Sequence, residues 1–246
     1  MAPPGARRAP ARPAAQRGAA LLLLLLVLLA GGATLLMSAF AGGDGAAEAG
    51  RERRTLQRLA EAREALFGYA VAHGRLPRPA ASAVDGNERA RPCANAQDCS
   101  GFLPWVALGV ERADGWDHLL RYSVSAALTA APVARSVVAD RVVLRRGADG
   151  TLYYLAGQDE CSTELLCVPA VVLSTGRDNF GVSRLGIAAA GAAYPDESAN
   201  AGAGRRFIER APSAAAGAPG GPYDDMLTWL SAPRLLRAMD AAGQLH

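Results

Sequence analysis

The chain has 246 residues, enough for one modest folded domain plus a segment outside it, and its formal net charge is +3. All 26 basic residues are arginine, and four of them lie within the first 17 positions, so the rest carries 22 arginines against 23 acids. A nearly neutral folded part lacks the basic face that nucleic-acid binding requires. We therefore expect no nucleic-acid partner.

The chain opens with an Arg-rich segment, residues 1–18, which we interpret as a leader. A predominantly apolar run of 22 residues follows, 19–40, and as a helix it would span about 33 Å, enough for a bilayer core of about 30 Å. Arginines precede this run, and Asp44 and Glu48 are the first charges after it. By the positive-inside rule we expect a membrane helix at 19–41 with a cytoplasmic N-terminus and an exported remainder.

The sequence contains two alternative sites at which the N-terminal segment could be cleaved. Ala39-Phe40-Ala41 fits the small-x-small pattern of a cleaved secretory signal. Cleavage after Gly18 would instead leave the apolar helix on the mature protein, with Ala19 as its first residue. The apolar run is longer than the roughly 7–15 residues of an ordinary signal, which favours the second alternative.

A second helical pattern follows over residues 46–72. Apolar side chains recur there at helical spacing, with charged residues on the other side; they are Leu56, Leu59, Leu66 and Ala70. Gly74 is expected to cap this helix, and Pro77 prevents its continuation. We assign residues 42–76 to an exported continuation of the N-terminal helix and residues 77–246 to a globular head.

Four cysteines lie beyond the apolar run, in what would be an oxidising compartment. They form two pairs with the same C-x5-C spacing, Cys93 with Cys99 and Cys161 with Cys167. That spacing is unusual for zinc, and no histidine lies near. We predict two local disulfides, although four cysteines allow three pairings.

The head is predicted to contain an antiparallel sheet of about four strands. Strand-like runs occupy residues 119–125, 141–146, 151–156 and 168–174. The middle two are joined by a turn-rich link at 147–150, which indicates a hairpin. Residues 186–222 are expected to be loop, and two short helices are expected to follow, the first capped by Asp224 and the second starting near Ser231 and ending at Gly243.

Acidic residues late in the chain are the candidate metal ligands. Calcium takes oxygen ligands from loop carboxylates and amides, and the candidates are Asp196, Glu197, Asn200, Asp224 and Asp225. The alternative is that Asp224 caps a helix and the others are solvated. No catalytic motif occurs and the three histidines, His73, His118 and His246, are scattered, so we expect no enzyme activity.

Three stretches together resemble prepilin-type proteins, the subunits of type IV pili and the pseudopilins of type II secretion systems. They are Gln16-Arg17-Gly18-Ala19-Ala20 running into leucines, residues 62–77 with 102–105 and 116–117, and residues 223–231. The resemblance implies an α+β, pilin-like fold, with a long N-terminal helix packed on an antiparallel sheet and short C-terminal helices. It also implies that Gly18 and Ala19 flank the processing site, that the mature N-terminus is methylated, and that calcium stabilises the C-terminal region. At the fifth mature position, where the family has a glutamate, this chain has Leu23. The absence of this glutamate resembles the minor subunits that lie at a filament tip.

The implied function is structural: a minor pilin or pseudopilin that helps to assemble or cap a periplasmic filament. Its partners would be other pilin or pseudopilin subunits, the prepilin peptidase and the inner membrane, with the head in the periplasm. The alternative is a membrane-anchored or secreted periplasmic binding module that does not polymerise.

Overall fold

The computed structural model describes the backbone of residues 16–163, 167–177, 181–188 and 194–246. Side chains are described for residues 21–29 and 45–163 and for the same later ranges. The chain divides into two compact units, Met1–Ala49 and Gly50–His246. Residues 1–15 of the predicted leader lie outside the described residues.

The first unit contains the beginning of helix α1, Gln16–His73, which includes Gly18 and Ala19. The side chains of residues 21–29 are all apolar, and each is between 56% and 70% exposed. Within the described side chains, no helix offers the length of apolar sequence that a membrane crossing requires. Within the predicted membrane helix, 19–41, side chains are described only for residues 21–29. The signal-cleavage alternative at residues 39–41 lies wholly outside the described side chains.

In the second unit, the part of α1 from Gly50 onward carries one buried face. Leu59, Leu66 and Ala70 are buried, as predicted. Leu56 is 56% exposed, so its assignment to the same face was wrong. The amide of Gly74 donates to Ala70 O at 2.9 Å with a positive φ of 66°, a conformation that glycine adopts without strain, and this ends the helix as expected.

The fold is α+β, and its larger sheet is antiparallel with four strands in the order β1-β2-β5-β7. The strands are β1 Ser100–Phe102, β2 Arg121–Val124, β5 Ala170–Ser174 and β7 Met226–Trp229. Two of the four predicted runs, 119–125 and 168–174, thus contain strands of this sheet.

The other two predicted runs form a separate sheet of order β4-β3-β6. Its strands are β3 Val142–Arg146, β4 Leu152–Ala156 and β6 Arg206–Glu209. The β3–β4 hairpin closes through Gly147 N to Thr151 O at 2.8 Å, as its turn residues predicted, whereas β6 pairs with β3 in parallel. The four predicted strand segments are therefore confirmed, but the prediction that they form a single sheet was wrong.

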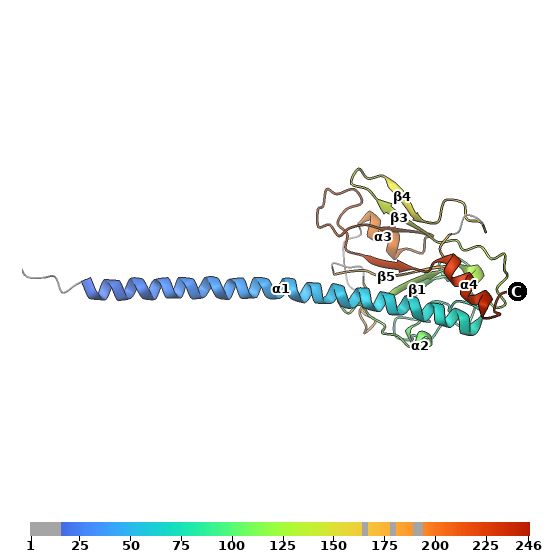
Figure 1. Cartoon of the computed structure of the whole chain (residues 1–246), viewed down its shortest axis with the longest axis horizontal. Helices are drawn as coiled ribbons and strands as arrows, with labels where there is room; N and C mark the ends of the chain where they lie inside the picture. Colours follow the sequence, from blue (N-terminus) through green and yellow to red (C-terminus); the bar gives the residue numbers. More distant parts are fainter. Residues whose placement is uncertain (1–15, 164–166, 178–180, 189–193) are drawn as a thin grey trace, which may run out of the picture. The chain divides into compact units, whose positions relative to one another are not determined.

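The four-stranded sheet lies between a helical layer and the smaller sheet. One face, with Tyr122 and Val172, shares a buried cluster with Leu66 of α1 and with Leu235 of α4, Ala232–Ala241. The other face, with Val171, packs on Val143 and Phe207 of the smaller sheet. Figure 1 shows this order within the second unit, with α1 on one side of β1 and β5 and the β3–β4 hairpin on the other.

The end of the chain differs from the prediction in two places. The first predicted C-terminal helix is strand β7, because residues 226–229 pair with β5 along their whole length. The stretch 186–222 contains helix α3, Pro195–Ala201, as well as β6. The second predicted helix is confirmed as α4. Two short helical turns, α2 Trp105–Leu108 and the 3₁₀ turn Ala126–Leu128, complete the described elements.

Candidate metal centre

Helix α3 and the loop before β7 carry the predicted metal ligands. Pro195 begins α3, where its fixed φ suits the first helical turn, and Asp196 and Glu197 follow at the N-terminal end, where the helix dipole favours negative charge. Asn200 lies one turn further along, so all three side chains share a face. That face is turned inward: Asp196 and Asn200 are at most 1% exposed, and Glu197 is also buried.

Three carboxylates converge at this point. One oxygen each from Glu197, Asp224 and Asp225 lies within 4.8 Å of the others. Glu197 Oε1 accepts the amide hydrogen of Asp224 at 3.0 Å, and Asp224 Oδ2 accepts that of Arg177 at 2.9 Å. The loop backbone therefore holds two of the three carboxylates in position.

The electrostatic environment disfavours three ionised acids at this position. Burial raises the pKa of Asp225 well above its usual value, and the charges of Glu197 and Asp224 raise it further. A hydrogen bond from Asn200 and the charge of Arg121 act in the opposite direction. A divalent cation would remove the repulsion, and carboxylate oxygens are the ligands that calcium prefers. These three residues fit such an ion, whose other ligands would be carbonyl oxygens or water.

Asp196 does not belong to this group. Its buried carboxylate accepts hydrogen bonds from Nε and Nη2 of Arg146, at 2.8 and 2.6 Å. It also forms an ion pair with Arg210 Nε at 3.0 Å. Two guanidinium groups neutralise it, and it lies outside the cluster of Glu197, Asp224 and Asp225. Its role is to join α3 to β3 and to the segment after β6.

Asn200 is likewise committed to the fold. Its Oδ1 accepts the amide hydrogen of Ile208 at 2.7 Å, and its Nδ2 donates to Ile208 O and to Asp225 Oδ2, each at 2.8 Å. The amide group thus joins α3 to β6, and Asn200 as a cation ligand stays a prediction. Its Nδ2 also orients Asp225.

Arg121 is the residue of this region that the sequence did not indicate. It lies at the start of β2 and donates a hydrogen bond from Nη2 to Ala201 O at 2.8 Å. Its Cζ lies over the ring of Phe102, 5.7 Å from the ring centroid. Burial lowers its pKa, while the charge of Asp225 raises it. An arginine at a strand end carries no sequence signal for this role, because its hydrogen bond to α3 joins residues 80 positions apart in sequence.

The two cysteine pairs have different outcomes. Cys161 and Cys167 are joined by a disulfide of 2.10 Å, which confirms one predicted bridge. Cys93 and Cys99 are thiols in the structure, so the second predicted bridge is not formed. They lie within hydrogen-bonding reach of each other: this contact lowers the pKa of Cys93 to about 7 and raises that of Cys99.

A buried cluster of Ser174, Asp114 and His118 has the residue types of a hydrolase triad but not its geometry. Ser174 Oγ donates to Asp114 Oδ2 at 2.5 Å, and Asp114 Oδ1 accepts the amide hydrogen of His118 at 2.9 Å. The serine therefore bonds to the acid rather than to the histidine, whose Nδ1 lies 2.9 Å from Gly176 O. Ser174 is fully buried, and its hydrogen bond to Asp114 joins β5 to the segment before β2.

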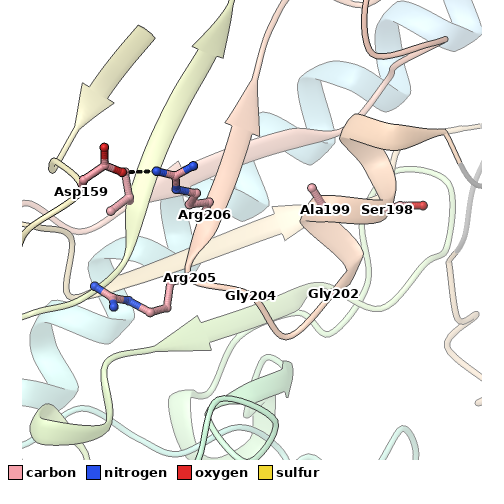
Figure 2. Close-up of a pocket in the computed structure, with 8 residues that line it drawn as sticks. Asp159, Ser198, Ala199, Gly202, Gly204, Arg205 and Arg206 are labelled. Carbon is pink, nitrogen blue, oxygen red and sulfur yellow. Dashed lines mark hydrogen bonds and ion pairs between the residues drawn. The ribbon is translucent and has the colours of Figure 1, made fainter. Parts of the chain in front are cut away.

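A surface pocket of about 550 Å³ lies near the end of α3 and the start of β6 (Figure 2). Arg206 forms an ion pair with Asp159 there, and Arg205 donates to Asp140 O at 2.9 Å. Ser198 is the hydroxyl residue among its lining residues, and no histidine is among them.

Comparison with protein-family models, with curated proteins and with solved structures finds no match to this chain.

Proposed function

We propose that this chain is a pilin-like structural subunit, a minor pilin or pseudopilin that helps to begin or cap a periplasmic secretion or pilus filament. In this proposal the prepilin peptidase cuts after Gly18 and leaves Ala19 as the mature N-terminus. Residues 19–40 hold the subunit in the inner membrane and later pack against other subunits. The head, in the periplasm, makes the contacts with neighbouring subunits.

The observation that carries the proposal is the run of exposed apolar side chains at residues 21–29. Water disfavours a contiguous apolar surface of this size, so these side chains need a lipid or protein environment. Nine consecutive apolar residues around a helix expose apolar surface on every side. A bilayer or a bundle of like helices would cover all sides at once, which a single groove cannot do.

The second unit supports the same proposal. The portion of α1 after Gly50 buries one face against the four-stranded antiparallel sheet. A helix that is apolar on all sides at its start and one-sided further along suits a subunit with an anchored end and a folded head. The Glu197, Asp224 and Asp225 cluster would be structural in this reading, with a cation joining α3 to the entry of β7.

The test is the N-terminal residue of the mature protein, measured by mass spectrometry on membranes with and without the prepilin peptidase. We expect a methylated Ala19 that disappears without the peptidase and in the Gly18→Leu variant. Ala41→Leu is the matched control, because it changes the alternative signal-cleavage site and should leave the Ala19 start intact. A start at Gly42 would refute the proposal. A start at Met1 or Ala2 would also refute it, in favour of a membrane-anchored module that does not polymerise.

A further inference from the structure

The turn before β1 brings the thiols of Cys93 and Cys99 together. The Cys99 amide donates to Asn95 O at 3.1 Å, and the Asp98 amide donates to Asn95 Oδ1 at 2.8 Å, so residues 95–99 form one closed turn. Asp98 Oδ2 also accepts the amide hydrogen of Ala94 at 3.3 Å. Ala94 and Asp98 are the chain neighbours of the two cysteines, so this bond holds both ends of the turn side by side. The contact between the two thiols is therefore built into the backbone of the turn.

The two thiols differ in their access to solvent. Cys99 is 1% exposed and belongs to the buried cluster that α1 shares with the four-stranded sheet. Cys93 is half-buried and packs against the edge of that cluster. A reagent in solution therefore meets Cys93 first, whereas Cys99 is shielded from solvent and lies within reach of the Cys93 sulfur.

A buried cation lies next to this pair. Arg141 is 1% exposed, and its Nη2 donates to Val124 O at 2.5 Å. The Val124 amide donates to Cys99 O at 3.0 Å, so the same strand end holds the guanidinium group and Cys99. The carboxylate partner of Arg141 is Asp140, at 2.6 Å, whose side chain is 36% exposed. A buried guanidinium group favours negative charge nearby, and a thiolate at Cys93 supplies such a charge.

The groups around Cys93 favour its thiolate form. Its hydrogen bond with Cys99 is the main factor that lowers the pKa of Cys93 to about 7; Thr129 and the charges of Arg141 and Arg89 act in the same direction, and burial opposes them. The same contact and burial raise the pKa of Cys99. Near neutral pH about half of Cys93 is thus thiolate, the nucleophile of thiol–disulfide exchange, beside a thiol that keeps its proton.

We propose that Cys93 is the entry thiol of a disulfide-exchange site, at which a disulfide oxidant, R–S–S–R, is taken up and Cys99 completes its reduction. In the first step the Cys93 thiolate attacks one sulfur of the oxidant, whose S–S bond breaks. A mixed disulfide forms, and R–S⁻ leaves and takes up the proton that Cys93 has lost. In the second step Cys99 attacks Cys93 Sγ and gives its proton to the second R–S⁻. Two protein thiols are oxidised to one disulfide, and R–S–S–R is reduced to two R–SH.

The surroundings of the pair predict that this disulfide opens again. A thiol of low pKa is a good leaving group, and stabilisation of its thiolate makes the disulfide easier to reduce. Cys161 and Cys167 have the same spacing but form a disulfide in the structure, whereas Cys93 and Cys99 are thiols. We therefore expect a dithiol form and a disulfide form of the turn, and this expectation does not rest on the proposed function.

The first test uses the full-length chain in mild detergent, with oxidised glutathione as the probe and peptide mass spectrometry as the readout. Excess reduced glutathione first prepares the dithiol form. In Cys99→Ser we expect a glutathione adduct to accumulate on Cys93. Cys93→Ser is the matched control, and its adduct on Cys99 should form at least tenfold more slowly, because Cys99 is buried. Circular dichroism checks the fold of both variants, and equal rates of adduct formation would overturn the proposal.

The second test needs no substitution. In the wild type, oxidised glutathione should give a Cys93–Cys99 disulfide without a lasting adduct, and reduced glutathione should restore both thiols while Cys161 and Cys167 stay bonded. Alkylation of Cys93 by iodoacetamide should level off above about pH 8, whereas the rate for an ordinary thiol, with a pKa of about 8.5, keeps rising. A lasting adduct on Cys93, a bridge that reduced glutathione cannot open in the folded chain, or an ordinary pH profile would each refute the exchange site.

Discussion

Replacement of Leu66 by alanine tests whether α1 supports the head through its buried face. Leu66 is fully buried in the cluster that α1 shares with the four-stranded sheet. The substitution removes three carbon groups, a transfer loss of about 2.4 kcal/mol, and the cavity left behind brings the total to about 3–4 kcal/mol. In a unit of this size that loss lowers the melting temperature by roughly 6–16 °C.

Leu56→Ala is the matched control, because it makes the same chemical change on the same helix. Leu56 is 56% exposed, so its replacement should change the free energy of unfolding by less than about 0.5 kcal/mol. Both variants are measured in the full-length chain in mild detergent, by thermal and urea unfolding followed by circular dichroism. Equal destabilisation by the two variants would refute the assignment of the buried face.

Two further predictions concern charged groups. In the presence of a chelator at pH 7, Asp225→Asn should be more stable than the wild type, because burial raises the pKa of Asp225 and its ionised form opposes folding. This difference in stability should vanish at pH values below 3.8, the pKa of the carboxyl in the unfolded chain. Calcium at about 100 times its dissociation constant should stabilise the wild type by about 2.7 kcal/mol and leave the stability of Asp225→Asn unchanged. An equal effect of calcium on the thermal melts of both proteins would contradict a calcium site at Asp225. For Glu88, burial by itself raises the pKa, but hydrogen bonds from Arg75, from the Arg78 amide and from Tyr69 outweigh it and lower the pKa to about 2. The ionised form of Glu88 therefore stabilises the fold at pH values above its unfolded pKa of 4.5, and this contribution is lost as the pH falls toward 2. In urea titrations, the difference in free energy of unfolding between the wild type and Glu88→Gln should narrow over that interval. A difference that does not change with pH would count against this contribution.

Local patterns explain the elements that were predicted correctly. The end of α1 follows from Gly74 and Pro77, and the β3–β4 hairpin follows from its turn residues, because both signals lie within a few residues of the structure they determine. The run 226–230 was assigned to a helix because its four apolar residues carry no decisive period. Its hydrogen bonds to β5, more than 50 residues away in sequence, make it a strand.

The candidate site divides in the same way. Acid-rich composition near the end of the chain was enough to select Glu197, Asp224 and Asp225. It was not enough to separate them from Asp196, because one of the two guanidinium groups that neutralise Asp196 belongs to Arg146, 50 residues earlier. The sequence contains the charge of both residues but not the distance between them.

The sequence by itself thus determined the apolar run near the N-terminus, the amphipathic part of α1, four strand segments and one disulfide, because periodicity, turn chemistry and short cysteine spacing act over neighbouring residues. The tertiary structure alone decided that these strands divide between two sheets, since β6 joins β3 in parallel from more than 60 residues away. It also decided which acids converge and which pair with arginine, and among the described strands it placed β4 at the end of the smaller sheet. Each of these outcomes depends on long-range contacts, whose free energy arises only when distant segments are packed against each other.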